Sequence, residues 1–159
     1  MRAAYEYFIR CGITEILLIG SSLGGTVAMI FASRTPEIKK LVTLAAPYLF
    51  EKLINKWFTG EMFTRFKKDG YAMLPDKAKI NWTFVDDALT YPFYEIIANV
   101  KCPIFFIHGN CDLVVDWENT RYAYGIAAAP KKILVIEGGD HPLNGHIDTF
   151  YPMLSSFLS

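Results

Sequence analysis

The sequence has no excess of charge of either sign, and it contains few cysteines. Its 16 acidic and 16 basic residues balance, and no cluster of lysine or arginine is interleaved with aromatic residues. The composition therefore does not predict binding to nucleic acid or to an anionic membrane surface. The three cysteines, Cys11, Cys102 and Cys111, lack the spacing of a metal site or a disulfide framework. We expect free thiols in a reducing compartment, the cytoplasm, and no bound metal.

Long apolar runs are also missing. The N-terminal residues MRAAYEYFIRCG have no apolar signal core, and no stretch approaches the roughly 20 apolar residues that a membrane-spanning helix needs. With 159 residues, 52% of them hydrophobic, the chain is long enough to bury one substantial core. We expect a soluble, unexported globular protein whose partners are small neutral molecules.

The stretch ILLIGSSLGG, at residues 16–25, is the feature around which the other motifs can be placed. From Gly20 to Gly24 it matches GxSxG, in which a strand turns sharply into a helix and presents the central serine, here Ser22. We expect the two glycines to relieve crowding across this turn. The backbone N–H of Leu23 is then a candidate donor to a developing oxyanion. The alternative is a glycine-rich turn that only packs tightly or binds an anion.

Apolar periodicity predicts the elements on either side of this turn. A buried strand begins at Glu15 and ends at Ile19, directly before the turn. The alternation of helices and strands predicts an α/β fold with a parallel sheet of about four strands and flanking helices. The expected helices cover residues 1–11, the turn to 35, 116–127 and 147–158, and the expected strands cover 15–19, 41–45, 103–107 and 132–136.

Residues 48–100 do not follow this pattern. Aromatic residues such as Trp57, Trp82 and Phe93 are spread there among charges and turn signals. The segment is too long for a plain crossover, so we expect an inserted cap of short helices or a hairpin. The chain then divides into core residues 1–47, the cap at 48–100 and core residues 101–159. The cap's aromatic residues either form its own core or line a substrate site.

Two polar residues follow the later strands in the order that suits a serine nucleophile. Asp112 comes just after the strand at 103–107, and His141 comes just after the strand at 132–136. Catalytic groups of open parallel sheets gather beyond the carboxyl ends of the strands, so we expect Ser22, His141 and Asp112 to meet there. The histidine would act as base and the aspartate would hold its tautomer.

Each of these assignments has an alternative. Asp116 could be the acid, although it also suits an N-cap of the next helix, and Asp140 could be the acid, although it lies close to the base in sequence. His146 competes with His141 as the base. We expect His108, in the sequence IHG at the end of a strand, to be a structural histidine.

Three motifs together resemble those of a known family. They are GSSLGGTVA at the sharp turn around Ser22, called the nucleophile elbow, YPFYEIIANVKCPIFFIHGNCDLVV around Asp112, and IEGGDHP at His141. The chain resembles the C-terminal part of an α/β-hydrolase, and specifically the carboxylesterases of the cinnamoyl/feruloyl esterase-like type. The resemblance implies a Ser22, His141, Asp112 triad that hydrolyses small apolar or aromatic esters through an acyl-enzyme, without a metal or organic cofactor. A peptidase, thioesterase or lactone hydrolase, or a noncatalytic fragment or assembly subunit, is the alternative.

The same resemblance implies that something is missing. The hydrolase fold begins with several strands before the elbow, and a loop after one of them supplies the second oxyanion amide. No such strands precede the first helix here, so we expect a partial hydrolase fold with the strand at 15–19 on the sheet edge. An apolar strand on an open edge recruits a partner, so a homo-oligomer or an N-terminal partner half is expected at this strand.

Overall fold

The computed structural model describes residues 1–73 and 79–159, which form two compact units. One unit contains residues 1–48 and 93–159, and the other contains residues 49–92. The inserted unit is thus shorter than the cap expected at 48–100, because residues 93–100 lie in the first unit, and residues 74–78 of that cap lie outside the described residues. Among the described helices, none has the length and apolarity that crossing a membrane requires.

The first unit is built on a parallel sheet. Its strands are β1 (Leu17–Ser21), β2 (Lys40–Leu44), β5 (Ile104–Gly109) and β6 (Lys131–Ile136). Every neighbouring pair is parallel and the order is β1-β2-β5-β6, which confirms the predicted α/β fold with a sheet of about four strands. All six residues of β5 are buried, as expected of a central parallel strand with both faces covered. In the described part of the chain, β1 is an edge strand.

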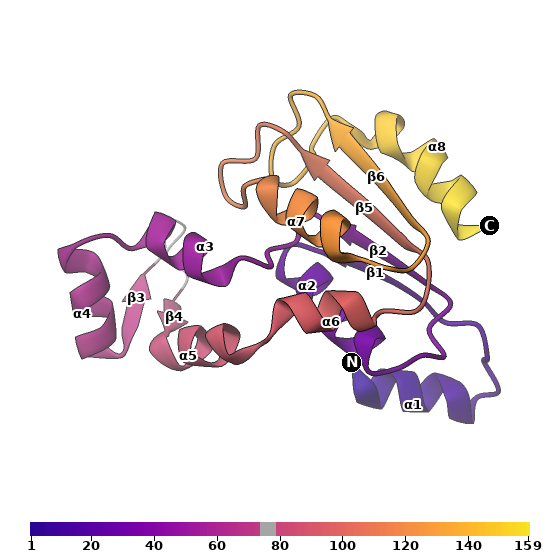
Figure 1. Ribbon diagram of the computed structural model, residues 1–159, viewed down its shortest axis with the longest axis horizontal. Coiled ribbons are helices and arrows are strands. Elements are labelled where there is room, and N and C mark those ends of the chain that lie inside the picture. The colour runs from indigo at the N-terminus through magenta and orange to yellow at the C-terminus, as the bar shows by residue number, and fades with distance from the viewer. Residues whose placement is uncertain (74–78) are drawn as a thin grey trace. The chain divides into compact units, whose positions relative to one another are not determined.

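Helices cover both faces of this sheet (Figure 1). Phe157 of α8 (Ile147–Leu158) packs with Val42, Phe105 and Ile107 on one face. The helices α2 (Leu23–Ser33), α6 (Phe93–Asn99) and α7 (Glu118–Ile126) lie against the other. A ring contact between Phe106 of β5 and Tyr124 of α7, with centroids 6.1 Å apart, belongs to this second face.

The helical spacing of Leu23, Val27, Ile30 and Phe31 predicts that these apolar residues form the buried face of α2, but the structure buries a different set. Leu23 and Val27 are 43% and 42% exposed, and the buried residues are Gly25, Thr26, Ala28, Met29 and Ala32. The physical reason is close packing, since a Cβ on Gly25 would lie only 2.7 Å from the Cβ of Ala46. Small residues therefore make up most of the buried face, together with Met29, whereas Leu23 and Val27 face outward.

An apolar surface is exposed along the β1 edge. Leu17 and Ile19 are 39% and 53% exposed, although the sequence pattern predicted a buried strand. The preceding helix, α1 (Arg2–Arg10), has no buried residue, and its Tyr7, Phe8 and Ile9 are exposed. Ile19 pairs with Val42 and so shares the sheet face of α8, whereas α1 contacts α2 on the other face through Tyr5 and Phe31. Exposed apolar groups therefore flank both sides of β1.

The inserted unit contains short helices and a pair of antiparallel strands. Its elements are α3 (Phe50–Trp57), α4 (Glu61–Asp69), the antiparallel strands β3 (Tyr71–Met73) and β4 (Lys79–Asn81), and α5 (Trp82–Thr90). The Trp82 ring contacts those of Phe63 and Phe66 at centroid distances of 5.4 and 5.1 Å. Trp82 thus packs within the unit's own core, one of the two roles left open for these aromatic residues.

Candidate active site

Ser22 lies at the sharp turn between β1 and α2. Its φ and ψ are 52° and −129°, a region that a residue with a side chain rarely adopts. The turn is held by a hydrogen bond from the Ser22 N–H to the Leu44 carbonyl of β2, 2.8 Å long. The geometry is that of a nucleophile elbow, as GxSxG predicted.

Two glycines allow this turn, and one of them is not the predicted one. A Cβ on Gly20 would overlap the carbonyl oxygen of Gly24, so Gly20 has the expected role. A Cβ on Gly24 would meet nothing within 4 Å, whereas one on Gly25 would press on Ala46 and on the Gly20 carbonyl. The second position that must lack a side chain is therefore Gly25 and not Gly24.

The backbone N–H of Leu23 opens α2 directly after Ser22. The first amides of a helix have no acceptor within the helix, and in the described residues the Leu23 N–H has none elsewhere. An unpaired amide at a helix N-terminus attracts negative charge. Leu23 thus has the chemistry of an oxyanion donor.

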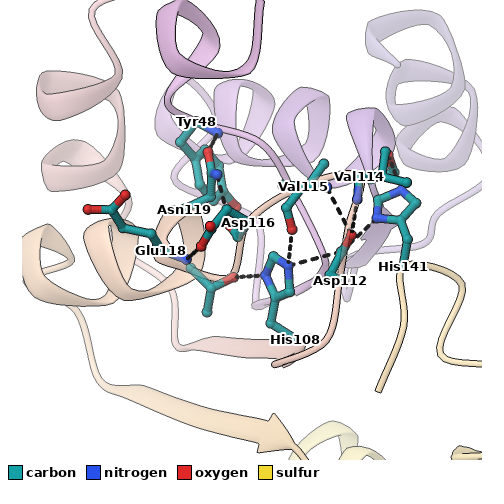
Figure 2. A network of polar contacts seen from close by, with 11 residues as sticks. Tyr48, His108, Asp112, Val114, Val115, Asp116, Glu118, Asn119 and His141 are labelled. Carbon is teal, nitrogen blue, oxygen red and sulfur yellow. Dashed lines mark hydrogen bonds and ion pairs between the residues drawn. The ribbon is translucent and has the colours of Figure 1, made fainter. Parts of the chain in front are cut away.

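Asp112 follows β5, and its carboxylate accepts four hydrogen bonds. Oδ1 accepts the N–H groups of Val114 and Val115 at 2.8 and 2.9 Å. Oδ2 lies between two histidines, 2.7 Å from Nδ1 of His141 and 3.1 Å from Nε2 of His108 (Figure 2). Burial raises the pKa of the Asp112 carboxyl, but the hydrogen bonds from His108, His141 and the Val115 amide outweigh burial and hold this pKa well below its usual range. Asp112 is therefore ionised at neutral pH.

His141 connects Asp112 to Ser22. Its Nε2 lies 3.0 Å from the Ser22 Oγ, and its side chain is 20% exposed. Because a carboxylate only accepts hydrogen bonds, Nδ1 carries the hydrogen, and in the neutral ring Nε2 can accept the serine proton. The three side chains thus form one hydrogen-bonded chain from hydroxyl to carboxylate.

The loops that carry Asp112 and His141 are hydrogen-bonded to each other. Asn110 donates through Nδ2 to the Glu137 carboxylate at 2.7 Å and accepts the Gly138 N–H through Oδ1 at 2.8 Å. The Cys111 N–H donates to the Gly139 carbonyl at 3.0 Å. No motif in the sequence predicts this contact. Its only local signal is the pair of glycine-containing loops, HGN and EGGD.

The alternative acids and bases have other partners. Asp116 accepts the N–H of Glu118, the first residue of α7, at 2.8 Å, and Asp140 accepts the Asn144 N–H at 3.2 Å. His146 directly precedes α8. His108 is buried on β5, where it contacts Asp112. In residues 1–73 and 79–159, no group of three or more His, Cys, Asp or Glu side chains is placed to hold a metal ion.

Comparison with known proteins gives distant relatives and similar folds. No family model matches the chain. Mouse mitochondrial palmitoyl-protein thioesterase ABHD10 is 25% identical over 148 residues, covering 83% of this chain and 47% of that protein. Ferulic acid-bound Est1E from Butyrivibrio proteoclasticus has a TM-score of 0.80 at 21% identity, covering 92% of this chain and 59% of that chain. The esterase domain of a Rhodothermus marinus protein has a TM-score of 0.75 at 20% identity, and the match covers 98% of this chain and 65% of that chain.

These likenesses cover most of this chain but only part of each relative. The chain spans about half the length of the curated thioesterase, 47%, and 59% of the Est1E chain. The chain therefore has an α/β-hydrolase fold, and the proteins and structures it resembles include esterases and a thioesterase.

Proposed function

We propose that this protein is a serine hydrolase that cleaves small apolar or aromatic carboxylic esters through an acyl-enzyme. One observation carries the proposal: Ser22 Oγ, His141 and Asp112 form a continuous hydrogen-bonded chain, with distances of 3.0 and 2.7 Å. A serine hydroxyl is a weak nucleophile at neutral pH, and an adjacent, oriented base activates it by accepting its proton. The esterase relatives support a hydrolytic role.

In the first half of the reaction, Ser22 Oγ attacks the ester carbonyl while His141 Nε2 takes the hydroxyl proton. Asp112 stabilises the resulting imidazolium through its bond to Nδ1, and the Leu23 N–H donates to the oxyanion. The carbon–oxygen bond of the ester then breaks, and the leaving alcohol takes the proton from His141.

In the second half, His141 activates a water molecule. The water gives its proton to Nε2 and attacks the acyl carbon, and Ser22 leaves as its hydroxyl after receiving that proton back. The products are an alcohol and a carboxylic acid, and the protein returns to its starting protonation.

The substrate class rests on resemblance. Est1E was solved with ferulic acid bound, which supports an aromatic acyl group for this chain. Thioester cleavage is the second candidate, because the mouse relative is a palmitoyl-protein thioesterase. We place the reaction in the cytoplasm, because Cys11, Cys102 and Cys111 are all free thiols.

A substrate panel tests this proposal. Purified chain is assayed with nitrophenyl esters of increasing acyl length, methyl ferulate, an acyl thioester and a peptide, and Ser22→Ala is the matched control. We expect turnover of the short and aromatic esters that disappears in Ser22→Ala. A preference for the thioester would favour the second candidate. Ester turnover that is equal in both proteins would contradict the role of Ser22.

A further inference from the structure

His108 is a buried titratable side chain that the proposed reaction does not use. It lies near the end of β5, four residues before Asp112, and its side chain is 0% exposed. A buried imidazole must satisfy both ring nitrogens, and their partners determine what it does. Those partners include a carboxylate oxygen of the candidate site.

The surroundings of His108 fix which ring nitrogen carries hydrogen. Nε2 lies 3.1 Å from Asp112 Oδ2 and 2.9 Å from the Val115 carbonyl oxygen. Both partners are acceptors, so Nε2 is protonated and donates to both. Nδ1 lies 2.7 Å from Thr120 Oγ1 of α7, and this hydroxyl donates to Nδ1 when the ring is neutral.

The two histidines share one carboxylate oxygen. Asp112 Oδ2 accepts from His108 Nε2 and His141 Nδ1, while Oδ1 accepts two backbone amides (Figure 2). Each donor stabilises the charged form of the carboxylate. With its other acceptor positions engaged by His108 and the amides, the oxygen facing His141 has little freedom to turn away.

We propose that His108 is a positioning residue, which holds Asp112 as an ionised carboxylate with Oδ2 directed at His141. The proton that His141 gains from Ser22 then stays on the imidazole instead of moving to Asp112. This catalytic consequence rests on the proposed function, whereas the hydrogen bond itself does not. The competing explanation is that His108 only ties β5 to α7 through Thr120.

Two substitutions separate these explanations. His108→Gln can place its amide N–H where Nε2 lies, whereas His108→Leu has similar bulk and no donor. We expect His108→Leu to lower kcat about tenfold to a hundredfold, with KM nearly unchanged, because a hydrogen bond to a charged group is lost. His108→Gln retains most of the turnover. Equal turnover per folded molecule in the two variants would overturn the positioning role.

A second readout does not depend on activity, and its first part uses the wild-type chain. In chain labelled with ¹⁵N at its three histidines, imidazole NMR gives the tautomer of each ring, and His146→Gln removes only the third set of signals. We expect His108 with hydrogen on Nε2, and a low-field Nδ1–H signal from His141 that persists in His108→Gln and broadens in His108→Leu. Wild-type His108 with a bare Nε2, or an unchanged His141 signal in a folded His108→Leu, would overturn the proposal. An inactive chain that gives the expected spectra would instead count against the proposed function alone.

Discussion

Gly109 and Gly139 are in direct backbone contact, since a Cβ on Gly109 would overlap the carbonyl oxygen of Gly139. Gly109 ends β5 and precedes Asp112, whereas Gly139 follows β6 and precedes His141. The contact therefore sets the separation of the two loops that carry the acid and the base. A side chain at Gly109 would push these loops apart.

Gly109→Ala should accordingly damage both stability and turnover. Overpacking of this kind lowers the free energy of unfolding by about 1–3 kcal/mol, and the His141 to Asp112 hydrogen bond should lengthen. Gly125→Ala in α7 is the matched control, because a Cβ there meets nothing within 4 Å, and helix propensity predicts a gain of roughly 0.5–1 kcal/mol. Urea unfolding measures the free energy of unfolding of the two variants, and an ester assay measures their turnover. Equal effects of the two substitutions would contradict the role given to the Gly109–Gly139 contact.

The loss of turnover caused by a glycine-to-alanine substitution at the elbow should depend on which glycine is replaced. Gly20→Ala and Gly25→Ala should both abolish turnover, because each added Cβ presses on backbone or on Ala46. Gly24→Ala should keep most of it, since its Cβ points into open space. Turnover and circular dichroism of the three purified variants provide the test. A Gly24→Ala protein as inactive as Gly20→Ala would show that the steric assignment is wrong.

Asp112 should make stability depend on pH in the acid range. The pKa of its carboxyl is lower in the folded protein than the value of about 3.9 for an unfolded chain. Its contribution is therefore fully present above about pH 4 and is lost as pH falls through the folded pKa. The difference in unfolding free energy between wild type and Asp112→Asn should be largest near neutral pH and shrink below about pH 4. Denaturant titrations at a series of pH values measure it, and a pH-independent difference would contradict the ionised assignment.

We propose that the β1 edge binds a polypeptide partner, either a second copy of the chain or a separate segment that supplies further strands. Leu17 and Ile19 expose apolar side chains beside strand backbone that has no neighbour on one side in residues 1–73 and 79–159, and such a surface promotes association. Light scattering of the purified chain should show oligomers or aggregates, and Ile19→Lys should reduce them. Tyr151→Lys, at an exposed residue of α8, should leave association unchanged. A well-behaved wild-type monomer would contradict this proposal.

The sequence predicts the sheet and the placement of Ser22, Asp112 and His141 because these features depend on short-range patterns. Ser22 directly follows an apolar strand, Asp112 and His141 lie in the loops after two others, and a parallel sheet brings the ends of its strands together. The prediction of α8 at 147–158 holds for the same reason, since one apolar face meets the sheet.

Other features could not be predicted because they depend on contacts between distant residues. The buried face of α2 is set by the fit of Gly25 against Ala46, not by the apolar period. The link from His108 to Asp112 requires the turn at residues 109–112, and only the folded loop reveals the shared oxygen. The exposure of Leu17 and Ile19 likewise depends on what neighbours β1, which its own sequence does not specify.

Covalent labelling tests whether Ser22 is an activated nucleophile. The purified chain is treated with a fluorophosphonate probe, and intact mass and peptide mapping identify the modified residue, with Ser22→Ala and Ser21→Ala as paired variants. We expect a single adduct on Ser22 in wild type and in Ser21→Ala, none in Ser22→Ala, and a strong loss of labelling rate in His141→Ala. Labelling that persists in Ser22→Ala, or a folded wild-type chain that takes up no probe, would contradict the proposal that Ser22 is an activated nucleophile.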